Sequence, residues 1–313
     1  MNTRSAARLG RQLLPFLVGC AMFATAPFVA ENFLRFGNLV AIATSCLVLL
    51  PAAIGMQALL VAGRFDLSLG ALSALIGVIT ALGLSWGFSW YFAAIVALLC
   101  GLLISTFTAL MVSVFRFDVL IATLAMMWIA RSLALVLADG KTIGPLFDEV
   151  GEIAAARVLG IDVSLLVAVG FALLVAFMLR FQLHCRRLYA VGSNESAARS
   201  AGINVVAELI LAFGIATAGA AVTGLIQLVR SESASPLVFQ ELSLECIAAC
   251  VLGGAALRGG RGSVLGACLG LLVVVALRNF VLALEVHVYW RYLAIGVLLL
   301  IATALDRATR VQH

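Results

Sequence analysis

An all-α fold with about ten membrane-spanning helices is predicted for this sequence by three observations. First, the 313 residues are 64% hydrophobic and only 11% charged, whereas ordinary soluble domains carry about 25% charged residues. Second, a spanning helix needs about 20 mostly apolar residues, so roughly 200 hydrophobic residues allow about ten spans. Third, the apolar runs at 165–178 and 269–277 are continuous, whereas the strands of a membrane β-barrel alternate in polarity.

The apolar runs divide the chain into successive spans within a single transmembrane domain of residues 1–313. The run at 243–257 is short and rich in glycine, so we expect residues 243–262 to form a broken or re-entrant segment that protein or a water-filled cavity covers. The predicted spans are 13–30, 39–62, 67–86, 90–115, 118–138, 161–181, 207–229, 243–257, 263–283 and 291–305.

The basic residues predict how the spans are oriented. The net charge is +5, but the basic residues are scattered through short loops and form no stripe, so we predict no nucleic-acid partner. If both termini are cytoplasmic, most basic residues lie on the inside, as is usual in membrane proteins. The inside set is Arg4, Arg8, Arg11, Arg64, Arg116, Arg180, Arg186, Arg187, Arg199, Arg258, Arg261, Arg307 and Arg310. The outside set is Arg35, Lys141, Arg157, Arg230 and Arg291.

Nucleotide-binding and catalytic motifs are not found in the sequence. The only lysine, Lys141, follows Gly140, but Leu135 occupies the position where a phosphate-binding loop needs its first glycine. The three histidines form no His-x-x-x-His pair, and no Gly-x-Ser-x-Gly elbow occurs. We therefore predict no catalytic site, no metal and no cofactor in this chain.

The inside loop at 183–206 is too polar to cross a membrane, and it contains signals for a short helix over Asn194–Ala201. Ser193 or Asn194 can cap the start of this helix, Glu195 suits its positive end, and Gly202 can end it in a left-handed conformation. A helix this short is marginal in water, so it needs a surface on which to dock. The alternative is an ordinary solvated loop.

Two further segments place polar or small residues beside apolar runs. In 63–70, Asp66 can cap the third span, and in 246–266 paired glycines permit either close helix packing or an unwound break. Arg131 is costly inside a span, so we expect it to face the bundle interior or to reach outward to the interface, with Asp139 as a candidate partner. Polar side chains at depth are candidates for a solute pathway, although hydrogen bonds between helices explain them equally well. The candidates are Gln57, Asp66, Ser68, Arg131, Gln227, Arg278 and Asn279.

Together these segments resemble the permease subunits of ribose-type ABC sugar importers, a bacterial family, over most of the chain. The matching motifs occur in order along the sequence. They are Gly63-x-x-Asp66-Leu67-Ser68-x-Gly70; Ala122-Thr123-Leu124 with Arg131 and Asp139-Gly140; Tyr189-Ala190-x-Gly192-x-Asn194-x-x-Ala197-Ala198-Arg199-x-x-Gly202-Ile203; and Glu241-Leu242 with Ile247-Ala248-Ala249, Gly253-Gly254 and Gly259-Gly260-x-Gly262-Ser263.

The resemblance implies a ten-span permease in the bacterial inner membrane that imports a monosaccharide or related small sugar. It implies three protein partners: a separate ATPase subunit that binds ATP and Mg, a second permease chain, identical or related, and a periplasmic sugar-binding protein. The loop helix would be the coupling helix that docks on the ATPase. Its carried-over residues are Tyr189, Gly192, Asn194, Glu195, Ala198, Arg199 and Gly202.

The sequence departs from the family's pattern at Arg64, which replaces a glycine, and at Asp118, which replaces a proline. The departure at Arg64 puts the backbone packing there in doubt. The alternative function is a self-sufficient secondary transporter or channel for a small hydrophilic solute. Such a protein needs carboxylates deep in its spans, and the candidate carboxylates are expected near span ends instead. These are Asp66, Asp118, Glu208 and Glu245.

Overall fold

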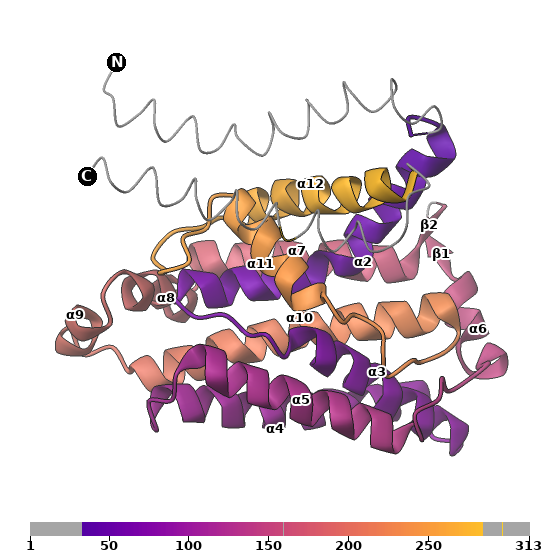
Figure 1. Ribbon diagram of the computed structural model, residues 1–313, viewed down its shortest axis with the longest axis horizontal. Helices are drawn as coiled ribbons and strands as arrows, with labels where there is room; N and C mark the ends of the chain where they lie inside the picture. The colour runs from indigo at the N-terminus through magenta and orange to yellow at the C-terminus, as the bar shows by residue number, and fades with distance from the viewer. Residues whose placement is uncertain (1–32, 159, 284–295, 297–313) are drawn as a thin grey trace.

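A computed structural model describes residues 33–158, 160–283 and 296 of the chain, and these form a bundle of α-helices (Figure 1). Within the described part of the chain, six helices are long and apolar enough to cross a membrane: α2 (Phe36–Val61), α4 (Trp90–Ser113), α5 (Val119–Leu137), α7 (Val163–Phe181), α10 (Val205–Ser231) and α12 (Val264–Ala283). Two apolar helices are shorter, α3 (Leu69–Ser85) and α11 (Leu242–Leu252). The remaining elements are α6 (Phe147–Ala155), α8 (Leu183–Ser193), α9 (Glu195–Ser200) and the antiparallel strands β1 (Arg157–Val158) and β2 (Ile161–Asp162).

The helices agree closely with the predicted spans. Each predicted span from 39–62 to 263–283 corresponds to one helix, while the predicted spans 13–30 and 291–305 lie outside the described residues. The predicted weak span, 243–257, contains only the 11-residue α11. It ends there because a glycine-rich stretch follows, in which Gly254, Gly259 and Gly260 have positive φ angles.

Polar side chains set where several helices begin. Ser89 accepts a hydrogen bond from the backbone of Phe92 at the start of α4. Asp118, the departure from proline, caps α5 by accepting from two backbone amides at its start. These side chains satisfy N–H groups that have no partner within the helix.

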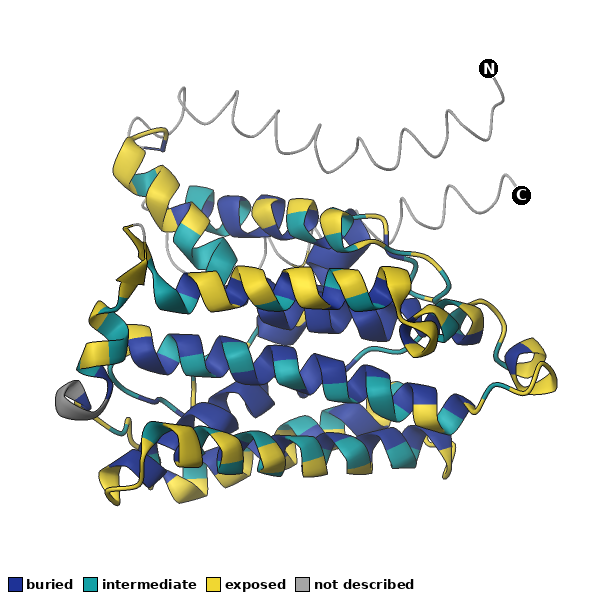
Figure 2. Ribbon diagram, turned by 180° about the vertical axis from the view of Figure 1, so that it is seen from behind, coloured by how far each residue is buried: buried dark blue, intermediate teal, exposed yellow. Residues whose placement is uncertain are grey.

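The central helix α10 packs against α2, α3 and α4. Small residues allow this close approach: a Cβ on Gly55 would lie 2.8 Å from the Cα of Ala216, and Gly219 and Gly224 meet the carbonyls of Pro51 and Ser73. The outward faces of the bundle remain apolar and exposed (Figure 2), an arrangement expected where lipid covers the surface. Exposed apolar side chains on these faces include Leu103, Phe107, Trp128, Leu173 and Phe177.

The bundle has two distinct ends and two breaks (Figure 1). α8 and α9 lie at one end, and α6 with β1 and β2 lies at the opposite end. The first break is the non-helical segment 62–68, which follows α2 at the α8 and α9 end and leads back into the bundle, where α3 begins. The second break is the non-helical segment 232–241, which follows α10 at the opposite end and leads back in the same way to the start of α11. Both breaks therefore place non-helical backbone inside the molecule.

Candidate functional site

The predicted loop helix is α9, and its two ends have the predicted caps. The side chain of Asn194 accepts a hydrogen bond from the backbone N of Ala197 at 3.0 Å. Gly202 has φ +79°, and at the C-terminus the N–H groups of Gly202 and Ile203 donate to carbonyls of the last turn, Ile203 to that of Ala198. α9 has six residues, shorter than predicted, and α8, which was not predicted, precedes it as an 11-residue helix.

Backbone contacts between glycines hold α8 against the rest of the bundle. A Cβ on Gly192 would lie 2.6 Å from the N of Gly260 and would overlap the carbonyl oxygen of Val61. The N–H of Gly260 donates to that same carbonyl at 2.8 Å. A Cβ on Gly259 would lie 2.6 Å from the Cα of Gly63. Three segments far apart in sequence, the end of α2, α8 and the glycine-rich stretch, therefore meet without room for a side chain.

Tyr189 fastens α8 to the same glycine-rich stretch. Its hydroxyl donates to the carbonyl of Gly262 at 3.2 Å. Gln57, predicted as a pathway residue, lies against Gly262 as well. Gln57 is fully buried, and neither of its side-chain polar atoms has a hydrogen-bond partner in the described structure. Gln57 on α2 thus lies against the same glycine that Tyr189 of α8 contacts.

Arg64 joins α9 to the first break. Its guanidinium donates to one carboxylate oxygen of Glu195 at 2.7 Å, while Arg199 donates to the other at 2.8 Å. The hydrogen bond from Arg199 and then the charge of Arg64 hold the pKa of Glu195 below its usual value. Gly63, with φ +74°, makes the turn before Arg64. The departure at Arg64 therefore supplies an ion pair, and Gly63 provides the required backbone conformation.

The first break is bonded inside the bundle to the start of α11, the helix that follows the second break. Ser243, at the start of α11, donates its hydroxyl to the carbonyl of Leu67 at 2.8 Å and accepts from the backbone N of Gly70 at 3.1 Å. In the first break, Asp66 accepts from both the backbone N and the hydroxyl of Ser68, at 2.7 and 2.6 Å. All of these side chains are buried. Asp66 was predicted to cap the third span, but the hydrogen bonds that it accepts in the described structure come from Ser68, the residue that precedes α3.

Arg131 supports the second break. Its guanidinium donates to the carbonyls of Pro236 and Val238, the latter at 2.8 Å, and more weakly to that of Phe239 at 3.5 Å. The expected pairing with Asp139 was wrong, because that carboxylate pairs with the neighbouring lysine at the exposed end of α5. The non-helical carbonyls need donors inside the bundle, and Arg131 supplies them.

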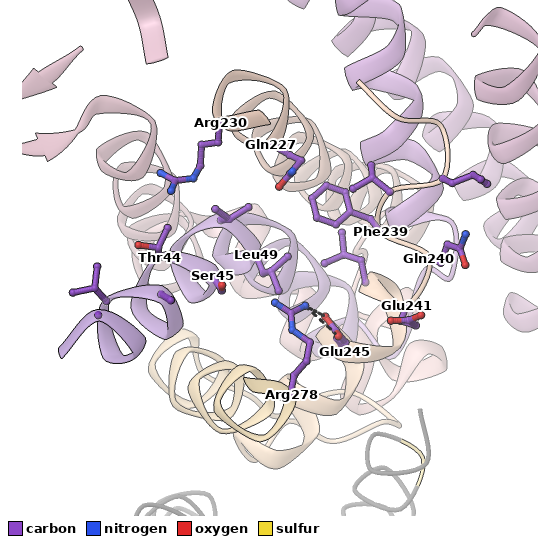
Figure 3. Close-up of a pocket in the computed structure, with 17 residues that line it drawn as sticks. Thr44, Ser45, Leu49, Gln227, Arg230, Phe239, Gln240, Glu241, Glu245 and Arg278 are labelled. Atoms are coloured by element: carbon purple, nitrogen blue, oxygen red, sulfur yellow. Dashed lines mark hydrogen bonds and ion pairs between the residues drawn. The ribbon is translucent and has the colours of Figure 1, made fainter. Parts of the chain in front are cut away.

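A cavity of about 850 Å³ opens beside the second break (Figure 3). α2, α10, α12 and the chain from 237 to 245 form its walls. At one side, Arg278 reaches from α12 to Glu245 on α11, with nitrogen–oxygen distances of 3.4 and 3.5 Å. The polar residues that line it are Thr44, Ser45, Gln227, Arg230, Gln240, Glu241, Glu245 and Arg278.

The structure brings few of the predicted pathway residues together. Gln227 lines the cavity, as does Arg278, whereas Gln57, Asp66, Ser68, Arg131 and Asn279 do not. Arg131 does not line the cavity itself, but it donates hydrogen bonds to the carbonyls of Val238 and Phe239, which do.

The sequence interpretation missed the role of Glu245. It was expected near a span end, but α11 begins inside the bundle, so its first turn is internal and Glu245 is 3% exposed. Asp66 is also internal, because α3 begins there in the same way. Glu208 does lie near the start of α10, and Asp118 is an exposed cap. The sequence did contain a signal for this ion pair: Glu245 is the one charged residue of the apolar run 242–252, and Arg278 is the one charged residue of the neighbouring run 264–283.

Comparisons with known proteins agree with this architecture. The family model for the branched-chain amino acid transport system / permease component matches residues 38–303. The ribose import permease protein RbsC of Escherichia coli (strain K12) is 32% identical over 301 residues, which cover 95% of this chain and 92% of that protein.

Two further relatives match over similar lengths. The ribose import permease protein RbsC of Haemophilus influenzae is 30% identical, with 97% of each chain covered. The L-arabinose transport system permease protein AraH of Escherichia coli (strain K12) is 29% identical, over 97% of this chain and 92% of that protein. No solved structure gives a significant match. The apolar helices, the motifs and these matches agree, and the chain therefore belongs to the permease subunits of simple-sugar ABC importers.

Proposed function

We propose that this chain is the transmembrane permease subunit of a bacterial ABC importer that translocates a monosaccharide or related small sugar, driven by a separate ATP-hydrolysing subunit. The observation that carries this proposal is the end-to-end match to permeases named for ribose and arabinose. The capped α9, which follows α8 and its close glycine contacts with the bundle, supports it as a preformed docking element.

The proposed topology has ten spans in a single domain of residues 1–313, with both termini in the cytoplasm. The eight apolar helices, six long and two short, together with the predicted spans outside the described residues, make up this number. The basic residues support the orientation. Those at the α8 and α9 end are Arg64, Arg116, Arg180, Arg186, Arg187, Arg199, Arg258 and Arg261, which favours placing this end in the cytoplasm.

The proposed partners follow from this arrangement. The ATPase subunit, which would bind ATP and Mg, would dock on α8 and α9, so this chain would need no nucleotide or catalytic site of its own. A second permease chain, identical or related, would complete the pathway, and a periplasmic binding protein would deliver the sugar to the opposite end. In the proposed docking surface, Asn194, Arg199 and Gly202 are exposed, while Ala198 is buried and positions the helix.

The buried carboxylates of Asp66 and Glu245 favour a second candidate, a secondary transporter or channel that works without an ATPase. The two candidates separate in one experiment. The purified chain is reconstituted in proteoliposomes, alone or with the ATPase subunit and the binding protein, and uptake of radiolabelled D-ribose and L-arabinose is measured. The proposed function predicts uptake that requires ATP and both partners, and uptake that Glu195→Lys or Gly202→Trp abolishes. Flux through the chain alone contradicts the proposal.

A further inference from the structure

At the cavity, an ion pair between Glu245 and Arg278 connects helices α11 and α12. Glu245 on α11 is buried, with 4% of its side chain exposed, and Arg278 on α12 is 25% exposed. Their nitrogen–oxygen distances of 3.4 and 3.5 Å exceed the roughly 2.7–2.9 Å of a tight charged hydrogen bond. A buried pair of this kind contributes little to stability, because desolvation offsets the attraction between the charges.

The loose pair has the chemistry that a sugar hydroxyl requires. A carboxylate only accepts hydrogen bonds and a guanidinium only donates them, whereas a hydroxyl does both. One hydroxyl, or two adjacent ones, can therefore donate to Glu245 and accept from Arg278 together. Figure 3 shows this pair on one side of the cavity and Gln227 on another.

An aromatic side chain is held in a strained conformation at the same cavity. Phe239 has φ +61°, a region that bulky residues rarely adopt and that is common at ligand clamps. Its carbonyl accepts from Arg131 and touches Gly70, where no side chain fits. The backbone around Phe239 is thus fixed from two sides. The ring lines a cavity in which half of the other lining residues are polar, and it offers a flat apolar surface.

The described residues that line the cavity include two carboxylates, Glu241 and Glu245, and two guanidinium groups, those of Arg230 and Arg278. Arg230 is also bonded to Asp162 of β2 at 3.0 Å, and in Figure 3 it lies across the cavity from the Glu245–Arg278 pair. Among these described groups no positive charge is left in excess to bind an anion, and donors lie beside acceptors, which favours a neutral polyhydroxylated solute over an anionic one.

We propose that this cavity binds the transported sugar as a neutral monosaccharide, with Glu245 and Arg278 bonded to adjacent ring hydroxyls and Phe239 against the apolar face of the ring. This inference rests on the proposed function and adds a site and a solute class to it. Glu245 and Arg278 are specificity-determining contacts, and Arg131 is a positioning residue that holds the wall.

The test measures binding in the cavity directly, in the reconstituted complex with its ATPase. Ser45 lines the cavity, so Ser45→Cys provides a thiol that a bound sugar protects from a water-soluble maleimide. The labelling rate is measured against increasing D-ribose, L-arabinose, 2-deoxy-D-ribose and D-ribose 5-phosphate. The parent chain gives the background from native cysteines, and Lys141→Cys, exposed at the end of the bundle away from α8 and α9, gives a site that neither sugar in the cavity nor the ATPase covers.

The inference predicts protection by D-ribose or L-arabinose and none by the phosphate ester. Adding Glu245→Gln raises the half-protecting concentration about tenfold, the effect of one hydrogen bond to a charged group. Adding Phe239→Leu raises it as well, and Glu152→Gln, an exposed change on α6, leaves it unaltered. Uptake is measured in the same liposomes.

Three outcomes overturn the inference: neither pentose protects, the phosphate ester protects as well as the pentoses, or neither Glu245→Gln nor Phe239→Leu shifts protection. ATP-driven uptake that persists in those cases leaves the proposed function intact. Uptake that needs no ATPase removes the proposed function, whether or not the thiol is protected.

Discussion

The α8 and α9 end and the cavity beside the second break are held together in opposite ways. At the α8 and α9 end, glycine backbones touch one another and leave no space for a methyl group. At the cavity, side chains from four elements surround open space, an ion pair is loose, and Phe239 is strained. The first region suits the transmission of force between rigid parts, and the second suits binding that changes during transport. Volume changes should therefore damage the first region most, and changes of hydrogen bonding the second.

The largest expected effect is that of Gly192→Ala at the tight end. The new methyl group overlaps the carbonyl of Val61 and the N of Gly260, and backbone cannot move aside cheaply. We expect a loss of about 3 kcal/mol or more in stability, together with loss of uptake. Gly214→Ala on α10 is the matched control, because no atom of the described part of the chain would lie within 4 Å of its new Cβ. Thermal unfolding of the purified chain compares the two, and equal melting temperatures would show that the contact is not tight.

The next effect is that of Arg131→Gln at the cavity wall. The shorter amide cannot reach the carbonyls of Pro236 and Val238, which are then left without a donor inside the bundle. We expect a loss of about 2–3 kcal/mol, since hydrogen bonds to charged groups are the strong ones. Arg180→Gln, on the exposed end of α7, removes the same charge without those bonds. Thermal unfolding that is identical for the two variants contradicts the assigned role of Arg131.

Ser243→Ala tests the hydrogen bonds that join the first break and the start of α3 to the start of α11. It removes one oxygen that donates to Leu67 and accepts from Gly70, with no change in backbone. We expect a loss of about 1–2 kcal/mol and slower uptake, because α11 is then free to shift relative to α3. Ser200→Ala on exposed α9 should be neutral in chemical denaturation. A neutral result for both would mean that the first break is not joined to α11 through Ser243.

The smallest effect concerns the partly exposed pair of Arg64 and Glu195. In a double-mutant cycle with Arg64→Ala and Glu195→Gln, we expect a coupling energy below about 1 kcal/mol that falls as salt is added. Because Arg199 and Arg64 lower the pKa of Glu195, this contribution is present above the ordinary pKa and is lost as the pH falls through the lowered one. A coupling energy that changes neither with added salt nor with falling pH would contradict an ion pair between Arg64 and Glu195.

The same two regions differ in how far the sequence predicts them. The caps at Asn194 and Gly202 are local signals, readable from a few neighbouring residues, and both were confirmed. The span positions were also readable, because apolar length is a local property. The length of α9 and the existence of α8 were not, since Cys185 and Leu188 form a buried face only against the rest of the bundle.

The cavity depends on pairings between distant parts of the chain. Arg131 contacts residues 105 or more positions away, so the nearby Asp139 was a wrong choice of partner. Glu245 faces the cavity only because α11 starts inside the bundle, which follows from the course of residues 232–241 and not from the run 242–252 itself. Sequence patterns show which polar residues are costly, but not which distant atoms satisfy them.

The proposed docking of the ATPase on the α8 and α9 end is tested most directly by cross-linking. Ser200→Cys on α9 and Lys141→Cys, exposed at the opposite end, are treated separately with a short thiol-to-amine cross-linker in the active complex. We expect a covalent adduct with the ATPase subunit from position 200 and none from position 141. An adduct from position 141, or none from position 200 while ATP-driven uptake continues, would contradict it.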